Sequence, residues 1–428
     1  MKMYLEGMSK RELIELIKGL MREMRQLKKE LGYERSEKLS EMFKPAVPND
    51  EAPKKPGAKE GHDGVTRPMP EKVDEKKKLF LRTCPQGHRL VKIKETRSRT
   101  VEDIELIRRL KIIEYELQGY YCKTCKKKVF PRVFDAMPHF RLGMNFCNYV
   151  CERKFAYRMS FNMIQKDLLK NFGLRVSQAT LVNAIHAVAS LLGKKYEAYK
   201  SLLREGRFVH IDETGWRVKG TNMWLWKFRS KDIVVTVIDK HRSHDVPERI
   251  LGKKYKGSMI HDGFPAYNLL AGEHQQCWTH ITRHSRNALK KYPDSKEVKK
   301  VHEALKRMYR DAKHTRKSKA ARKRFEARMK YLLAKRHRNP DIIKLKSFMK
   351  AHFDELFVFV AKRIDGTNNA AEQSIRHDVV IRKISGGNRS DNGREDYAVL
   401  SSAMQTCQLR NEDFSELVMN ELKSTANG

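Results

Sequence analysis

The chain has 428 residues and is strongly basic, with 90 Lys and Arg against 52 Asp and Glu and a net charge of +38. This length exceeds one ordinary domain, and a hydrophobic fraction of 40% is enough for more than one core. The sequence contains no run of about 18 apolar residues and no signal-peptide pattern, so we expect neither a membrane span nor secretion. We expect such a basic chain to bind a polyanion, and an anionic membrane surface is the alternative.

The cysteine content points to a reducing compartment. Seven cysteines are an odd number in a long chain without a secretory signal, which argues against a disulfide framework. Reduced thiols or a metal site are expected instead, in an intracellular protein.

The first 43 residues are predicted to form a coiled-coil, leucine-zipper-like helix. Ser9 and Glu12 form a capping box at its start. Apolar residues then follow in steps of four and three, the a/d spacing of a coiled coil; they are Leu13, Ile17, Leu20, Met24, Leu27 and Leu31. An amphipathic helix docked on its own domain would show the same stripe, but the mixed charge beside the stripe favours self-association. Residues 44–78 have six prolines among Lys, Glu and Gly, which predicts a disordered linker.

Residues 79–140 are predicted to bind a structural zinc ion. Cys84 and His88 form C-x3-H, and Cys122 and Cys125 form C-x2-C beside several lysines. Two such pairs suit a tetrahedral Zn²⁺. The alternative is a passively packed cysteine pair and an unrelated histidine, and His88 is the weakest of the four candidates.

Residues 141–205 are predicted to be a helical DNA-binding domain. Cys147 and Cys151 lie one helical turn apart, as core positions of a helix do. Further on, a Gly173 turn separates an apolar-periodic helix from a second helix with Ser177 at its N-cap. Helix, glycine turn and capped helix form the pattern of a helix-turn-helix, although many helical bundles share it.

The period changes to two after residue 206. The segments "RFVHID", "MWLWKF", "DIVVTVID" and "SMIHD" read as consecutive strands, the first ending in Asp212 and the last in Asp262. Strands that end in acidic residues predict an α/β core with its site at the strand ends. Residues 281–350 read as helices with 25 Lys and Arg against 6 Asp and Glu, a net of +19. We expect these helices to contact phosphates, and a solvated basic surface is the alternative.

A third acidic residue, Glu372 in "GTNNAAEQSIR", has two possible roles. Read locally, Asn369 is an N-cap and Glu372 completes its capping box. Read together with Asp212 and Asp262, it is a metal ligand. Phosphoryl transfer can use two Mg²⁺ ions about 4 Å apart, and converging carboxylates suit such hard cations.

Four segments carry a resemblance to a known family; in chain order they are "HIDETGWRV", "HDGFPAYN", "CWTHITRH" and "TNNAAEQSIRHDVVIRK". The chain resembles the DDE transposases of insertion sequences, most closely the insertion-sequence sixty-six family, over nearly its whole length. The resemblance implies an RNase H-like catalytic core, with a first part at 206–280, a basic helical insertion at 281–364, and a second part with the C-terminal tail at 365–428. The sequence departs from the family at the first pair of predicted zinc ligands, Cys84 and His88, where relatives usually show a second C-x2-C.

The same resemblance implies the site residues. Asp212, Asp262 and Glu372 would be the catalytic residues and would hold two Mg²⁺. Arg376, Arg382 and Lys383 would face DNA phosphates, with a solvated helix surface as the alternative; they lie on and after the Glu372 helix. Glu213 and Asp365 fall off the motif positions and are left out. Cys277, His280 and His284 have a spacing that suits a metal, but we favour packing, with Cys277 and Trp278 ending a strand and His280 near the site.

The implied activity is Mg²⁺-dependent DNA cleavage and strand transfer at the ends of a mobile element. The implied partners are double-stranded DNA of the terminal inverted repeats and of the target, and further copies of the chain in a homodimer or higher oligomer, without a membrane. The implied location is the prokaryotic cytoplasm, at the nucleoid. Two alternatives remain: a catalytically inactive, domesticated DNA-binding protein, and an RNase H-like nuclease or resolvase.

Overall fold

The structure is a computed structural model that describes residues 110–113, 116, 120–122, 127–129 and 142–426. The predicted coiled coil and the predicted linker lie outside these residues. No helix in the described part of the chain is long and apolar enough to cross a membrane.

A short antiparallel ladder lies in the predicted zinc region. Strand β1 (Tyr120–Cys122) pairs with β2 (Lys127–Val129), and Cys122 is the partner of Lys127. The other predicted ligands, Cys84, His88 and Cys125, lie outside the described residues, so the zinc site stays a prediction.

A group of helices precedes the main sheet. They are α4 (Met144–Cys151), the π-helical turn η1 (Glu152–Ala156), α5 (Phe161–Phe172), α6 (Gln178–Leu191) and α7 (Gly193–Glu205). Cys147 and Cys151 are fully buried on α4, as predicted. Gly173 ends α5 in the left-handed conformation with φ +64°, where a side chain would be strained. The Ser177 hydroxyl caps α6 by accepting the Thr180 N–H at 3.1 Å. The predicted helix, glycine turn and capped helix are therefore confirmed.

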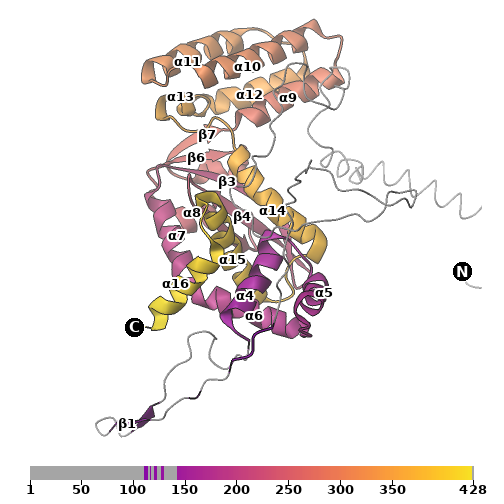
Figure 1. The fold of residues 1–428 in the computed structure, drawn as a ribbon. Helices are drawn as coiled ribbons and strands as arrows, with labels where there is room; N and C mark the ends of the chain where they lie inside the picture. Colours follow the sequence, from indigo (N-terminus) through magenta and orange to yellow (C-terminus); the bar gives the residue numbers. More distant parts are fainter. Residues whose placement is uncertain (1–109, 114–115, 117–119, 123–126, 130–141, 427–428) are drawn as a thin grey trace, which may run out of the picture. The chain divides into compact units, whose positions relative to one another are not determined.

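The main sheet has the strand order β5-β4-β3-β6-β7 (Figure 1). Its strands are β3 (Phe208–Val218), β4 (Thr221–Arg229), β5 (Val234–Asp239), β6 (Ser258–His261) and β7 (Glu273–Gln276). Strands β3, β4 and β5 form an antiparallel meander, whereas β6 and β7 run parallel to β3. Helix α8 (Asp245–Leu251) and the 3-10 turn η2 (Pro265–Leu269) lie on the connections.

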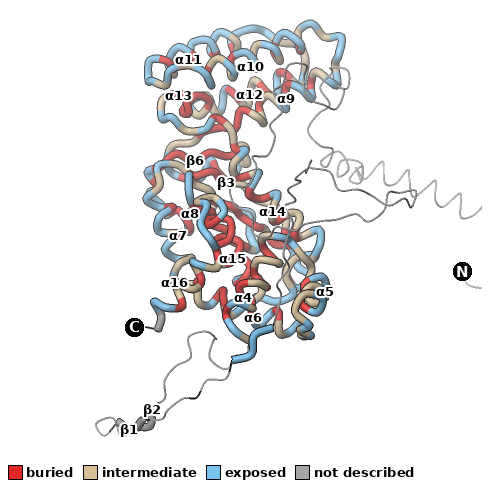
Figure 2. The backbone as a smooth tube through the Cα atoms, viewed as in Figure 1, coloured by how far each residue is buried: buried red, intermediate tan, exposed pale blue. Residues whose placement is uncertain are grey.

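The edge strand β5 is covered by α15 (Asp391–Arg410). The Val234 N–H donates to Thr406 Oγ1 at 3.0 Å, and the Thr236 N–H donates to Ser402 Oγ at 2.8 Å. Side chains of α15 thus satisfy backbone donors that an open edge would expose. Figure 2 shows the buried backbone concentrated along α15 and the neighbouring strands.

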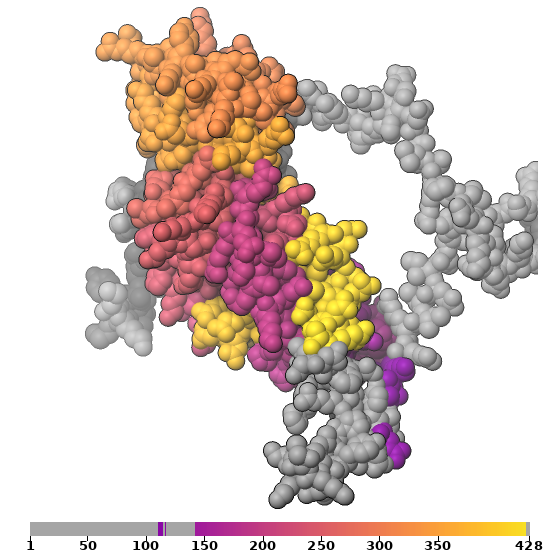
Figure 3. Space-filling view, turned by 90° about the vertical axis from the view of Figure 1, so that its left-hand side faces the viewer, coloured from indigo at the N-terminus to yellow at the C-terminus, as the bar shows by residue number. Residues whose placement is uncertain are grey.

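A basic helical insertion follows β7. It consists of α9 (Trp278–Lys291), α10 (Lys296–His314), α11 (Lys319–Ala334), α12 (Pro340–Ala351), η3 (Phe353–Glu355) and α13 (Val358–Lys362). The insertion has its own core, in which Trp278 stacks on Tyr309 with ring centroids 5.6 Å apart. It is bonded to the sheet through Gln275 of β7, whose Oε1 accepts the Phe359 N–H at 2.7 Å. In the space-filling view of Figure 3 the orange residues of the insertion form the top of the molecule. The predicted helices of 281–350 are confirmed.

Two helices return to the sheet after the insertion, and α16 (Phe414–Ala426) follows them. Helix α14 (Asn369–Ser385) packs on β3 and β4, and α15 packs on β5. The mixed α/β class predicted from the sequence is confirmed.

Candidate active site

Asp212 lies inside β3 and does not end it, so this part of the prediction is wrong. The strand continues to Val218 because β4 pairs with it residue by residue as far as Thr221, with Lys227 opposite Asp212. The parallel strand β6 pairs with β3 only as far as His210, which lies opposite Ile260. Asp212 therefore lies where β6 has left β3 and one side of the strand is open.

Strand register brings Asp262 to the same point. Asp262 is the residue after β6, two positions past Ile260, just as Asp212 is two positions past His210. Equivalent residues of neighbouring parallel strands lie about 5 Å apart and point to the same face. The ladder ends at His210 and Ile260, but extending its register by two residues brings Asp262 beside Asp212.

A tight turn fixes the Asp262 side chain. Its Oδ1 accepts the Phe264 N–H at 3.1 Å. Between them Gly263 has φ +91°, and an added Cβ would lie 2.7 Å from Gln276 Oε1. Only glycine fits this turn without displacing its neighbours.

A relay of hydrogen bonds through His274 and His261 supports the Gly263 turn. The Leu270 carbonyl can only accept, so His274 Nε2 donates to it at 3.0 Å, and His274 Nδ1 accepts from His261 Nε2 at 2.9 Å. His261 Nδ1 in turn accepts the Gly263 N–H at 3.2 Å. Burial holds the pKa of His261 well below its ordinary value, so the ring is neutral as the relay requires.

Glu372 lies in the first turn of α14, but the predicted capping box is wrong. The helix begins at Asn369, the N-cap is Asn368, and no side chain caps the turn. The Glu372 carboxylate is thus not used by its own helix. Its Oε1 is buried and has no hydrogen-bond partner among the described residues, which suits a ligand atom better than a capping atom.

Asn368, which the sequence did not single out, connects the segments that carry the three acids. It is fully buried, and its Nδ2 donates to the carbonyl of Ile211, the residue before Asp212, at 2.7 Å. Its carbonyl accepts the Glu372 N–H at 3.2 Å, and its own N–H donates to Cys277 Sγ at 3.1 Å. The Cys277 N–H donates to the carbonyl of His261, the residue before Asp262, at 3.0 Å. The Asn368 side chain is therefore anchored to β3 through its amide nitrogen, while its Oδ1 has no hydrogen-bond partner among the described residues.

The three carboxylates interact electrostatically. Burial raises the pKa of Asp212 well above its ordinary value. Repulsion from nearby carboxylates raises this pKa further, and they belong to Glu213, Asp262 and Glu372. A group of repelling carboxylates with an unsatisfied buried oxygen fits a hard divalent cation, which would reverse the repulsion.

Glu213 points to the opposite face of β3 and organises the loops behind the site. Its Oε1 accepts from Arg242 Nη2 at 2.7 Å and Nε at 2.9 Å, and its Oε2 accepts from the Tyr267 hydroxyl. Burial raises the pKa of Glu213, and these two donors oppose the rise. The guanidinium of Arg242 also lies 3.9 Å from the ring centroid of Phe264, beside Asp262. Its satisfied carboxylate agrees with leaving Glu213 out of the triad.

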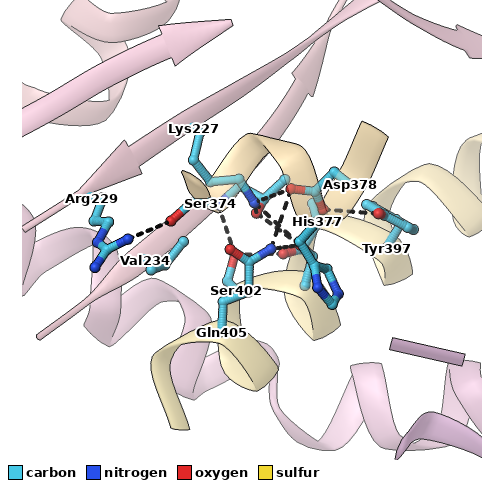
Figure 4. A network of polar contacts seen from close by, with 12 residues as sticks. Lys227, Arg229, Val234, Ser374, His377, Asp378, Tyr397, Ser402 and Gln405 are labelled. Atoms are coloured by element: carbon cyan, nitrogen blue, oxygen red, sulfur yellow. Dashed lines mark hydrogen bonds and ion pairs between the residues drawn. The ribbon is translucent and has the colours of Figure 1, made fainter. Parts of the chain in front are cut away.

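A buried ion pair holds α14 on the sheet (Figure 4). Lys227 Nζ of β4 lies 2.6 Å from Asp378 Oδ2 of α14, and both side chains are fully buried. The hydroxyls of Tyr397 and Ser401 each donate to Asp378 Oδ1 at 2.8 Å. Burial alone would raise the pKa of Asp378, but the charge and hydrogen bond of Lys227 outweigh it and hold that pKa below its ordinary value.

A second contact from β4 holds the first turn of α14. Arg229 Nη1 donates to the Ala370 carbonyl at 2.9 Å and to Ser374 Oγ at 3.3 Å. These partners flank Glu372 in the sequence. The sequence alone could not pair β4 with α14, because about 140 residues separate the partners.

The predicted DNA-binding residues differ in their surroundings. Arg376 and Lys383 are exposed on α14. Arg382 is half-buried, and its Nη1 donates to Thr214 Oγ1 at 3.3 Å and to the Gly215 carbonyl. Burial lowers the pKa of Arg382. This side chain is engaged in docking α14 on β3, which the sequence did not indicate.

The strand predicted to end in Cys277 and Trp278 stops earlier. Strand β7 ends at Gln276, Cys277 is the N-cap of α9, and Trp278 is its first residue. His280 lies near the site as expected, with Nδ1 3.8 Å from Glu372 Oε1. Asp365 is exposed and lies 3.6 Å from His210 Nε2, outside the triad.

Comparison with known proteins identifies the family of the chain. The model of the Transposase IS66 family matches residues 139–396, a range that contains all three acids. The chain is also 22% identical to the uncharacterized protein y4hP of Sinorhizobium fredii, over 82% of this chain and 72% of that protein. Because the family model matches more than half of the sequence, from the helices before the sheet to α15, the chain belongs to the IS66 family of transposases.

Proposed function

We propose that this transposase cleaves DNA at the ends of its mobile element and joins the freed end to target DNA, with Asp212, Asp262 and Glu372 as its catalytic carboxylates. The observation that carries the proposal is the convergence of these acids. Extending the β3–β6 register past its last pair, His210 with Ile260, brings Asp262 beside Asp212. Asp262 and Glu372 both act electrostatically on Asp212, Glu372 from a separate helix. The acids come from positions 50 and 110 residues apart in the sequence, so local structure alone does not require this meeting.

The sheet supports an RNase H-like core, as the resemblance implies. The long central strand β3 pairs with the antiparallel strand β4 on one side and with the parallel strand β6 on the other. The insertion begins after β7 and ends before α14, between the second and third acid.

The residues present fit Mg²⁺. Three carboxylates supply only oxygen ligands, and Glu372 Oε1 has no hydrogen-bond partner among the described residues. When bound, a pair of such ions supplies activation of the attacking oxygen and charge stabilisation of the leaving oxygen. Asp212, Asp262 and Glu372 would hold them, while Asn368 and the Lys227–Asp378 pair keep the carboxylates in position.

The proposed chemistry has two displacements at phosphorus. In the first, the oxygen of water bonds to phosphorus at the element's end and gives up a proton, the P–O3′ bond breaks, and the departing 3′ oxygen takes up a proton to become a hydroxyl. In the second, that 3′ oxygen bonds to a target phosphorus and loses its proton, and a target 3′-hydroxyl leaves. No side chain forms a covalent bond to DNA. The exposed cations of α14 and the basic helices α9 to α12 would hold the phosphates on either side.

The test compares cleavage with binding on the same DNA. The substrate is a duplex that ends in the inverted repeat found beside the gene. Asp212→Asn, Asp262→Asn and Glu372→Gln should each lower strand cleavage in Mg²⁺ by at least about 100-fold, because each removes charge stabilisation in the transition state. Binding of the DNA should stay close to wild type, because phosphate contacts elsewhere hold it.

The matched control is Asp365→Asn, which changes a nearby carboxylate whose side chain is 70% exposed. It should cleave like the wild type. Normal cleavage by Glu372→Gln would show that the assignment of the triad is wrong. Loss of DNA binding in all three triad variants would indicate misfolding or a binding role.

A further inference from the structure

We propose that Cys277, His280 and Glu372 form a second cation site, which takes a borderline divalent metal of the Zn²⁺ type and shares Glu372 with the acidic triad. Cys277 is the N-cap of α9, His280 lies one turn later, and Glu372 faces them from α14. One ligand atom from each residue lies within 4.8 Å of the other two.

The distances suit a tetrahedral ion. His280 Nδ1 lies 3.8 Å from Glu372 Oε1. In a tetrahedral zinc site with bonds of about 2.0–2.3 Å, neighbouring ligand atoms are separated by roughly 3.3–3.7 Å. The three atoms therefore reach a common ion with shifts of well under the length of one bond.

Two of the three ligand atoms lack a hydrogen-bond partner in the described part of the chain. His280 Nδ1 and Glu372 Oε1 are both buried and have no hydrogen-bond partner among the described residues. Buried polar atoms nearly always have a hydrogen-bond partner, so two neighbouring atoms without one indicate that a ligand such as a metal ion belongs between them. Cys277 Sγ is buried and already accepts the Asn368 N–H at 3.1 Å. A hydrogen bond to the sulfur of this kind stabilises a thiolate bound to a metal.

The donor set selects the class of metal. A thiolate, an imidazole and a carboxylate suit Zn²⁺ or Co²⁺, whereas Mg²⁺ takes oxygen ligands. The second site and the acidic triad thus prefer different ions but both need Glu372. Zinc bound here would withdraw Glu372 from the triad and inhibit cleavage; this consequence, unlike the binding itself, rests on the proposed function.

The hydrogen bond between Arg283 and His280 competes with metal binding, and the effect on metal affinity can be measured. Its Nη1 lies 3.0 Å from His280 Nε2. A guanidinium only donates, so Nε2 accepts and the ring proton is on Nδ1. Metal binding at Nδ1 moves that proton to Nε2 through solvent and breaks the Arg283 bond. Because Arg283 is exposed, its side chain is able to leave, and Arg283→Ala should tighten metal binding by about tenfold.

The experiment uses Co²⁺ as the spectroscopic probe for this site in the full chain. Thiolate-bound Co²⁺ absorbs in the near ultraviolet, and any cysteines of the predicted N-terminal zinc site would absorb equally in every variant. The difference between wild type and Cys277→Ser therefore reports the proposed site. We expect a band in that difference, saturation at higher Co²⁺ when millimolar Mg²⁺ occupies Glu372, and saturation at about tenfold less Co²⁺ in Arg283→Ala.

A second variant protects the test against a folding defect in Cys277→Ser. His280→Gln keeps the thiol and should lower the affinity for Co²⁺ by at least about tenfold, following the loss of one ligand. Identical titrations of wild type, Cys277→Ser and His280→Gln would overturn the proposal. A chain that shows the band but never cleaves DNA refutes the proposed function alone. A chain that cleaves in Mg²⁺ but shows no band refutes the second site alone.

Discussion

The buried Lys227–Asp378 pair gives a quantitative prediction about how α14 is held. Lys227→Met keeps a long, flexible side chain in the same space but removes the charge. Asp378 would then remain fully buried with hydroxyl donors and no cation. Breaking a buried pair by removing one partner costs about 3–5 kcal/mol. At about 2–4 °C per kcal/mol for a unit of this size, Tm should fall by roughly 10 °C near pH 7.

The pH dependence of this loss follows from the pKa of Asp378. In the wild type Lys227 holds that pKa below its ordinary value, so the pair's stabilisation is present at neutral pH and disappears as pH falls through the lowered pKa. In Lys227→Met, burial acts without the cation and raises the pKa of Asp378 above its ordinary value. The variant is then destabilised increasingly as pH rises through the raised pKa. The gap in Tm between the two proteins should be widest near neutral pH and should narrow toward about pH 4.

Thermal unfolding followed by near-ultraviolet circular dichroism, repeated across pH, measures this gap. The control is Lys227→Met combined with Asp378→Asn, whose amide oxygen still accepts from Tyr397 and Ser401. The double variant should recover more than half of the lost stability, because no charge is left buried. A Tm within about 2 °C of wild type for Lys227→Met at pH 7, or a gap that does not change with pH, would refute the reasoning.

Three further predictions concern other parts of the chain. Asn368→Ala should raise the Mg²⁺ concentration needed for half-maximal cleavage and lower the rate by about tenfold or more, with unchanged DNA binding, because it releases β3 from α14; an unchanged Mg²⁺ dependence would remove its positioning role. In Cys277→Ser, which lacks the second site, metal analysis after purification without chelator should find about one Zn²⁺ per chain, lost when Cys122 or Cys125 also becomes Ser; finding none would contradict the four-ligand site. Leu20→Lys should weaken self-association in sedimentation across a concentration series, since it puts a charge in an apolar seam. A monomeric wild type at high micromolar concentration would leave the coiled coil unsupported.

Local sequence patterns predicted much of the fold. The period-two apolar runs located β3 to β6, and the glycine and serine signals located the boundary between α5 and α6. These features depend on residues that are close in the sequence, as conformational preferences and capping do.

The details of the site depended on contacts that no local pattern contains. Asp212 lies within its strand because β4 continues to pair beyond it. The capping box failed because the N-cap is Asn368, one residue earlier than predicted, and the amide nitrogen of Asn368 bonds to the Ile211 carbonyl, 157 positions away. Helix boundaries are uncertain by a residue or two from sequence, and such a shift changes which asparagine is the N-cap of the helix. No local pattern pairs Lys227 with Asp378, which the fold brings together from β4 and α14.

The most direct test of the account asks whether the triad holds a cation against the DNA phosphate that is cut. One non-bridging oxygen of the scissile phosphate is replaced by sulfur, which binds Mg²⁺ poorly and Mn²⁺ better. The wild type should cleave one of the two stereoisomers in Mn²⁺ but not in Mg²⁺, and Glu372→Gln should cleave that isomer with neither ion. Equal cleavage of both isomers by the wild type in Mg²⁺, or rescue of Glu372→Gln by Mn²⁺, would contradict the account.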